Sequence, residues 1–134
     1  MAFSQNFPDA ELKCHCGCNV NHCTQKLVDA LEALRLMVGP VTVTSGYRCG
    51  PHNAKLGGAA NSQHRIGTAA DVKVSGMSPA EVYQAARKIP AFQGFGVAST
   101  FCHLDVRTVA AKWCYGADGK QCAWDAKLDG EVVA

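Results

Sequence analysis

Apolar residues at helical spacing predict two helices. The first extends from Thr24 to Gly39, because threonine commonly accepts a free backbone amide at a helix start and glycine ends a helix without strain. The second extends from Ser78 to about Lys88, since it opens with serine, proline and glutamate in capping order and Pro90 ends it. The apolar positions of the first helix, which we expect on one buried face, are Leu27, Val28, Leu31, Leu34 and Leu36.

Four short apolar or alternating segments predict strands. They are residues 41–44, 70–74, 95–98 and 100–106. Residues 45–60 are rich in glycine and predict a loop with one short helical turn. This order of elements predicts an α+β domain with a small, mostly antiparallel sheet and flanking helices. Alternation along the last strand places on one face Phe101, His103, Asp105 and Arg107.

Length and composition limit the classes of function. A chain of 134 residues with 48% hydrophobic and 18% charged residues is typical of one globular domain. We expect that domain over residues 1–134, with a cysteine-rich loop at 1–23 and an irregular tail at 114–134. A net charge of +2 gives no support for nucleic acid as a partner, and no apolar run reaches the ~18 residues of a membrane span. We expect a monomer.

The chain contains eight cysteines, and four of them cluster near the N-terminus. The first residues lack the basic start and apolar core of a signal peptide, so we expect synthesis in the cytoplasm, where disulfides are uncommon. Three interpretations stay open: disulfides, reduced thiols and a second, structural zinc site. The one-residue spacing differs from the usual two-residue spacing of zinc-binding pairs. The residues of this candidate site are Cys14, Cys16, Cys18 and Cys23.

Two histidines and an aspartate supply the donor atoms of a zinc site. His64 and Asp71 flank Gly67, and small residues there let the backbone fold so that both side chains reach one point. His103 follows on a strand that we expect beside that of Asp71, and neighbouring strands lie about 4.8 Å apart. Two imidazoles and one carboxylate, with a fourth position open for water, form the ligand set of a catalytic zinc ion.

Arg48 is a further candidate at the end of the first predicted strand. It leaves that strand through the glycine turn Ser45-Gly46-Tyr47. Its planar guanidinium suits a carboxylate or an oxyanion. Taken alone, the residue would be interpreted by default as part of a surface salt bridge.

These motifs together resemble the zinc D-Ala-D-Ala carboxypeptidase superfamily. That group includes the vancomycin-resistance D-Ala-D-Ala dipeptidases, the L-alanyl-D-glutamate endopeptidases of phage endolysins and the zinc fold of hedgehog signalling domains. The resemblance is greatest to a short, single-domain branch of bacteria and phages, in which a Cys-X-Cys-Gly-Cys stretch often precedes the helix. It covers roughly residues 7–113. The matching motifs are Ser45-Gly46-Tyr47-Arg48, Ser62-X-His64-X2-Gly67-X-Ala69-X-Asp71 and His103-X-Asp105-Val106-Arg107.

The resemblance implies a hedgehog-like zinc fold and a role for each motif. The zinc ligands would be His64, Asp71 and His103. Arg48 would bind substrate and stabilise the oxyanion that forms when water attacks the scissile carbonyl, and Ser62 would support His64 or bind substrate. The chemistry agrees, because a fixed guanidinium stabilises charge that appears only in the transition state.

The general base departs from the family pattern. Many members place a carboxylate or histidine two or three residues before the last zinc histidine, but this chain has Thr100 and Phe101 there. Asp105, two residues after His103, is the best substitute as catalytic base, and it could instead orient His103 beside the metal. His52 is a weaker candidate.

We therefore expect a zinc metallopeptidase that cleaves peptidoglycan stem peptides at a D-residue bond, as a D,D-carboxypeptidase does. One alternative is an endolysin-type L-alanyl-D-glutamate or D,D-endopeptidase. A second is a non-catalytic, zinc-containing module that binds the cell wall. Each of these would act on the wall, in the periplasm or after release by lysis.

Overall fold

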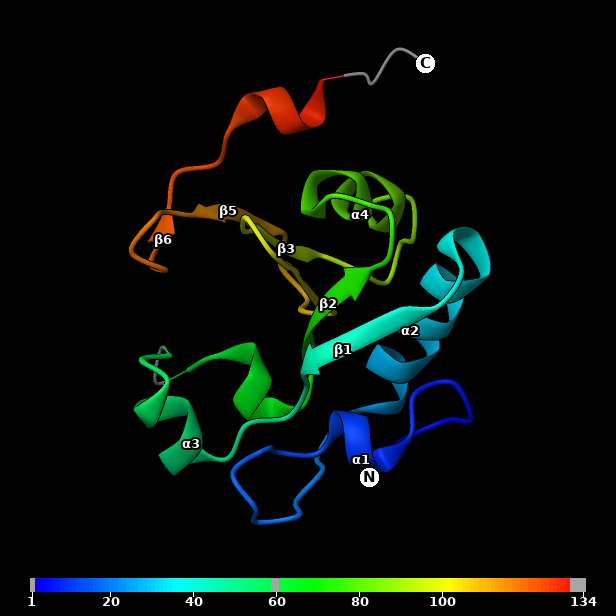
Figure 1. Ribbon diagram of the computed structural model, residues 1–134, viewed down its shortest axis with the longest axis vertical. Helices are drawn as coiled ribbons and strands as arrows, with labels where there is room; N and C mark the ends of the chain where they lie inside the picture. The colour runs from blue at the N-terminus through cyan, green and yellow to red at the C-terminus, as the bar shows by residue number, and fades with distance from the viewer. Residues whose placement is uncertain (1, 59–60, 131–134) are drawn as a thin grey trace.

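A six-stranded sheet forms the centre of the molecule, in the strand order β1-β2-β4-β3-β5-β6 (Figure 1). The computed structural model describes residues 2–58 and 61–130. Neighbouring strands are antiparallel except β3 and β5, which run parallel, so the predicted α+β fold with a mostly antiparallel sheet is confirmed. The strands are β1 (Val41–Ser45), β2 (Ala69–Val74), β3 (Gly94–Val97), β4 (Cys102–Asp105), β5 (Ala111–Tyr115) and β6 (Gln121–Cys122).

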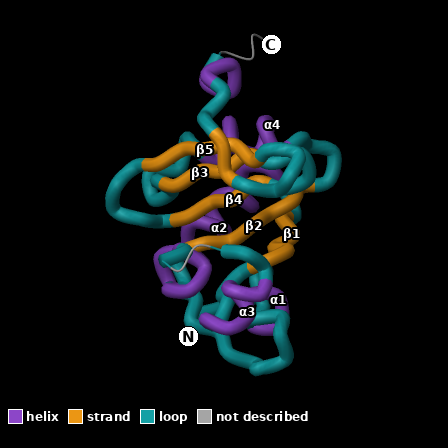
Figure 2. The backbone as a smooth tube through the Cα atoms, turned by 90° about the vertical axis from the view of Figure 1, so that its left-hand side faces the viewer, coloured by secondary structure: helices purple, strands orange, loops and turns teal. Residues whose placement is uncertain are grey.

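Helices cover one face of this sheet and one end of the molecule. Helices α2 and α4 pack against the same face and contact each other, and Figure 2 shows α2 behind the strands. Helices α1 and α3 lie at the lower end in both views. None of the described helices is long and apolar enough to cross a bilayer. The helices are α1 (Asp9–Leu12), α2 (Gln25–Val38), α3 (Gly50–Lys55) and α4 (Pro79–Ala86), with 3-10 turns η1 (Gln63–Ile66) and η2 (Ala126–Asp129).

Both long helices begin where their capping residues predict. The Thr24 hydroxyl accepts from the backbone amide of Leu27, and Ser78 and Glu81 form a reciprocal capping box. The predicted buried face of α2 is wrong in one position, because the side chain of Leu36 is 88% exposed. Two residues after Leu34, a helical side chain points about 200° away from it.

The two faces of the sheet differ in chemistry. Alternate residues of β2 and β4, such as Val72 and Leu104, enter the hydrophobic core with α2 and α4. The residues between them therefore project from the opposite face, which these helices leave uncovered. Asp71, His103 and Asp105 belong to this second set, and all three are nevertheless buried.

The C-terminal tail is more regular than the sequence predicts. Cys114 and Tyr115 continue β5, and β6 and η2 follow, so the expectation of an irregular tail at 114–134 is wrong for these elements. Residues 131–134 lie outside the described chain. Asp129 ties η2 to the body, since it accepts from Tyr83, Lys112 and Trp124. These contacts come from distant segments, and no local pattern signals them.

A substitution at Gly67 tests the turn between η1 and β2. A Cβ there would lie 1.8 Å from the carbonyl oxygen of His22, and φ is +78°. We expect Gly67→Ala to lower the free energy of unfolding by about 2–5 kcal/mol, since it adds left-handed strain to an overpacked contact. In the matched control Gly76→Ala, φ is +81° with nothing within 4 Å, so the cost should be only about 1–2 kcal/mol. Urea unfolding measures both, and equal losses would contradict a role for the His22 contact.

Candidate metal centre

One row of residues across the open face of the sheet carries the site. Asp71 on β2 is the register partner of Ser45 on β1 and of His103 on β4. His103 in turn pairs with Gly96 on β3, which pairs with Trp113 on β5. The prediction that the His103 strand lies beside the Asp71 strand is confirmed. Two of the three predicted ligands are thus neighbours by sheet register alone.

The third ligand, His64, reaches the row from η1. The Ser62 hydroxyl accepts from the His64 amide at 3.2 Å, which fixes the start of this turn. Gly67 ends it in a left-handed conformation and returns the chain to β2. The His64 carbonyl also accepts from the Arg48 amide at 3.0 Å. Ser62 therefore supports His64, which is one of the two roles expected for it.

The three side chains converge on one point. Oδ1 of Asp71 lies 3.3 Å from Nε2 of His64 and 3.1 Å from Nδ1 of His103. One donor atom from each of the three residues lies within 4.8 Å of the other two. Ligand atoms bound to one tetrahedral zinc ion at about 2.0–2.2 Å are separated by about 3.3–3.6 Å. The distance from Asp71 to His64 falls in this range, and the distance from Asp71 to His103 is slightly shorter.

The opposite nitrogen of each imidazole fixes its orientation. Nδ1 of His64 lies 2.8 Å from the carbonyl oxygen of Gly46, which can only accept, so this nitrogen carries the proton. Nε2 of His103 lies 2.8 Å from Oδ2 of Asp105, so an ionised Asp105 requires a proton there as well. Both lone pairs that face Asp71 are then available to a metal. Such oxygen partners are typical of zinc-binding histidines.

The environment separates the pKa values of the two histidines. Burial lowers the pKa of His64 below its usual 6.5. Burial alone would also lower the pKa of His103, but hydrogen bonds with Asp105 and Asp71 raise it above 6.5. Burial likewise favours a raised pKa for Asp71, yet its hydrogen bonds with His103 and His64 hold that pKa far below the usual value. The site therefore presents an ionised carboxylate between two imidazoles.

Asp105 lies on the far side of His103 from this point. Its side chain is fully buried, and Arg107 grips both oxygens, from Nε to Oδ1 at 2.8 Å and from Nη2 to Oδ2 at 2.7 Å. Gly94 makes room for it, because a Cβ there would lie 2.1 Å from either oxygen. These contacts favour an orienting role over that of a base. His52, the weaker candidate, is half-buried on α3.

Arg48 lies beside the three converging side chains. Its Nη2 lies 3.2 Å from Oδ2 of Asp71, and its Nε donates to the Ser45 hydroxyl at 3.0 Å. The side chain is 16% exposed, so it is held by the protein while part of it still faces solvent. A guanidinium has five N–H donors, and these two contacts leave several for a substrate oxygen.

Trp113 is a site residue that sequence reasoning missed. Its ring lies 5.0 Å from that of His103, between centroids, and the Arg107 guanidinium lies 5.1 Å from the Trp113 ring. Gly96 makes this possible, because a Cβ there would lie 2.6 Å from Nε1 of Trp113. The parallel pairing of β5 with β3 brings Trp113 to this position. The sequence around Trp113 has no strand pattern that would predict this pairing.

A cluster of sulfur atoms forms a second group of possible metal ligands. It consists of Cys14, Cys16, Cys18 and Cys49. The prediction of Cys23 as the fourth member is wrong, and Cys49 takes its place. Cys23 is 2% exposed, its thiol donates to the Leu12 carbonyl, and burial raises its pKa to about 11. Cys23 directly precedes the Thr24 cap of α2 and faces the core.

Comparison with known proteins relates the chain to a peptidase family. A family model described as peptidase M15 matches residues 5–105, a range that includes the three converging ligands and Arg48. The zinc D-Ala-D-Ala carboxypeptidase of Streptomyces albus G is 41% identical over 59 residues. This alignment covers 42% of the present chain and 23% of that relative, so the chain spans about a quarter of the relative's length.

Zinc affinity at this site should fall as the pH is lowered. Zinc binds only the neutral form of each imidazole, so protons compete with zinc for both histidines. Because the pKa of His103 is raised, protons already compete for His103 above pH 6.5. Because the pKa of His64 is lowered, protons compete for His64 only at a lower pH. Below the pKa of His103 we expect about a tenfold loss of affinity per pH unit. Competition with a chromophoric chelator between about pH 5 and 8 measures this. The measurement is made in a Cys16→Ser/Cys18→Ser variant, so that the sulfur cluster does not contribute to zinc binding. A zinc affinity that stays constant over this pH range would refute the expectation.

Proposed function

Since the chain belongs to the peptidase M15 family, we propose that it is a zinc peptidase that hydrolyses peptidoglycan stem peptides at a bond involving a D-residue. The observation that carries this proposal is the convergence of His64, Asp71 and His103. The similarity to the zinc D-Ala-D-Ala carboxypeptidase of Streptomyces albus G supports a D,D-carboxypeptidase. The cell wall would then be the place of action.

The ligand side chains fit zinc in number, kind and orientation. They offer Nε2 of His64, Oδ1 of Asp71 and Nδ1 of His103, which leaves a tetrahedral ion one open position. When bound, zinc supplies Lewis-acid polarisation of a carbonyl and makes water nucleophilic near pH 7. The protein's part is to hold these three donors in place before substrate arrives.

We propose that Arg48 stabilises the negative charge that develops in the transition state. When water attacks the scissile peptide, negative charge accumulates on the carbonyl oxygen. The Arg48 guanidinium is fixed by Ser45 and Asp71, so it can donate to that oxygen without reorganisation. Ser62 acts through the backbone of His64 and so assists indirectly.

Asp105 acts in this proposal as a positioning residue. It accepts a hydrogen bond from the Nε2–H group of His103 and so keeps the lone pair of Nδ1 free for the metal. Its own charge is balanced by Arg107, whose side chain is 25% exposed, whereas Asp105 itself is fully buried. The carboxylate is therefore committed to His103 and Arg107.

The enclosure of Asp105 also favours a second candidate function. Thr100 and Phe101 occupy the positions at which a base is expected, and neither accepts a proton. The carboxylates that contact the ligand histidines in the described chain are Asp71 and Asp105, and both are engaged. A zinc-containing module that binds the wall without cutting it is the alternative.

Hydrolysis of purified muropeptides separates the two candidates. We expect the zinc-loaded chain to release terminal D-alanine from pentapeptide stems, and a chelator to abolish the release. Asp71→Asn, which removes a ligand charge at unchanged size, should be inactive as well. Mass spectrometry of the products reads the outcome. An internal cut would assign an endopeptidase instead, and intact stems at saturating zinc would overturn the peptidase proposal in favour of wall binding.

Substitutions of Arg48 and Asp105 should have different kinetic signatures. We expect Arg48→Ala to lower kcat by about 10²–10³ while zinc affinity is retained, because one transition-state donor is lost. Arg48→Lys should restore part of kcat, since it keeps the charge.

Asp105→Asn should weaken zinc binding about 10–100-fold, because the partner that orients His103 loses its charge. Kinetics at saturating zinc, together with chelator competition, separate the two effects. If Asp105→Asn instead bound zinc normally and lost kcat, Asp105 would be the catalytic base.

A further inference from the structure

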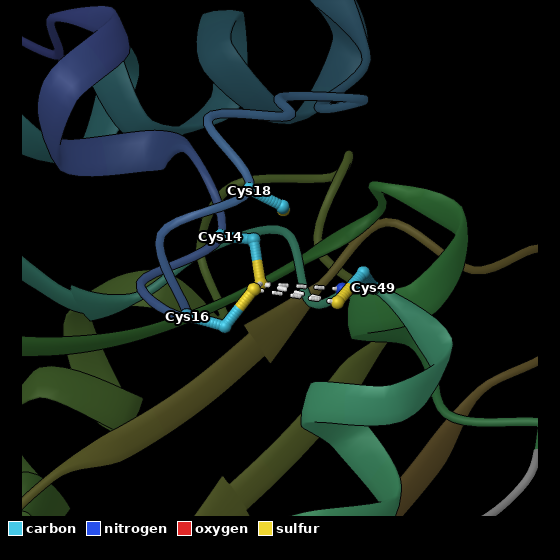
Figure 3. Close-up of side chains that lie close together, drawn as sticks. All are labelled: Cys14, Cys16, Cys18 and Cys49. Atoms are coloured by element: carbon cyan, nitrogen blue, oxygen red, sulfur yellow. Dashed lines mark hydrogen bonds between the residues drawn. The ribbon is translucent and has the colours of Figure 1, made fainter.

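We propose that Cys14, Cys16, Cys18 and Cys49 bind a second, structural zinc ion that fastens the N-terminal loop to the segment carrying Arg48. Figure 3 shows the sulfur atoms of Cys14, Cys16 and Cys49 close together, with Cys18 beside them, and Cys49 comes from a separate segment of the chain. The site needs no substrate, so it stands independently of the proposed peptidase function.

The spacing of the sulfur atoms matches a tetrahedral metal site. Sγ of Cys14 lies 3.4 Å from that of Cys16 and 3.7 Å from that of Cys49, and Cys16 and Cys49 are 3.6 Å apart. All four sulfurs lie within 4.8 Å of one another. Zinc–sulfur bonds of about 2.3 Å in a tetrahedron place the sulfurs about 3.8 Å apart, whereas a disulfide brings two of them to about 2.0 Å. Three near-equal separations fit a shared ion better than any one pairwise bond.

The backbone is shaped to bring these thiols together. The loop closes on itself through a hydrogen bond from the Cys14 amide to the Val20 carbonyl at 2.8 Å. Gly17, at φ +98°, supplies the left-handed turn that lets Cys16 and Cys18 face the same point. Cys49 approaches from the other side as the residue before α3, and its amide donates to Sγ of Cys14 at 3.4 Å. Such amide donors stabilise the thiolates of metal sites.

Hydrophobic packing does not account for the cluster. Cys14 is buried, but Cys16 and Cys18 are exposed on a polar loop, where a thiol gains little from burial. Four thiolates on one divalent ion carry a net charge of about −2, which a basic neighbour offsets. The Arg65 guanidinium lies close to Gly50, the residue after Cys49, and its single positive charge would offset part of this negative charge.

A metal here would support the candidate active site through the chain that it holds. Cys49 follows Arg48, whose amide donates to the carbonyl of the ligand His64 at 3.0 Å. On the other side, the Tyr47 amide donates to the Leu12 carbonyl at 2.9 Å, which already attaches the N-terminal segment at this position. The ion would replace flexible loop contacts by a rigid joint one residue from Arg48.

Metal content tests the proposal directly. We expect two zinc ions per chain by elemental analysis of reduced protein, and one in Cys16→Ser/Cys18→Ser. The matched control is Cys114→Ser/Cys122→Ser, which removes two thiols outside the cluster and should keep both ions. His64→Ala should keep one ion, the one bound by the sulfur cluster. Adding Cys16→Ser/Cys18→Ser to His64→Ala should remove that remaining ion. One ion per wild-type chain that survives Cys16→Ser/Cys18→Ser would overturn the proposal.

Alkylation of the unmodified chain keeps the test valid if those variants fail to fold. Cys16, Cys18 and Cys122 are all exposed thiols, so all three should react with an alkylating reagent when metal is absent, and each metal-free rate serves as the reference for the same residue. With zinc bound, peptide mapping should show Cys16 and Cys18 protected at least tenfold and Cys122 unchanged. Unchanged alkylation rates of Cys16 and Cys18 at saturating zinc would exclude the site, as would a disulfide that joins Cys16 to another cysteine of the cluster.

Discussion

The pairing register of β2 with β4 is the constraint on which the rest of the site depends. It sets Asp71 directly beside His103 on one face, while Val72 and Leu104 enter the core on the other. A slip of one residue would turn the ligands toward α2 and α4 and expose the core residues. The hydrophobic effect that packs the helices onto the sheet therefore also holds the ligands in register, and stability and chemistry are specified by the same alternation. The polar face has no independent scaffold.

Small residues let that polar face be crowded without strain. Two glycines of β3 leave the space that the carboxylate of Asp105 and the indole of Trp113 occupy beside His103. The histidine is thus held by an ionised partner at one ring nitrogen and by an aromatic ring close to it. A side chain on either glycine would displace one of these supports before it touched the ligands. The orientation of His103 therefore depends on residues that are not metal ligands themselves.

The sequence predicts what is local or periodic and misses what depends on long-range pairing. Capping residues located α2 and α4, and alternation placed His103 and Asp105 on one face, because these signals lie within a few residues of one another. The position of Trp113 depends on a parallel pairing between β3 and a strand beyond the catalytic motifs, which no local pattern encodes. The prediction of Cys23 as the fourth member of the sulfur cluster is wrong for the same reason. Cys23 is close to Cys18 in sequence but packs in the core, whereas Cys49 is distant in sequence and lies beside Cys14 in space.

The segment from Tyr47 to Cys49 links the two groups of ligands. Its central residue contacts Asp71 through the guanidinium and His64 through the amide, and its last residue belongs to the sulfur cluster. A loop end of this kind would ordinarily be mobile, since it has left the sheet and has not yet entered α3. Electrostatic stabilisation of a transition state requires the opposite, a donor that is already in place. Joining that segment by a metal to the loop that carries Cys14, Cys16 and Cys18 would meet this requirement.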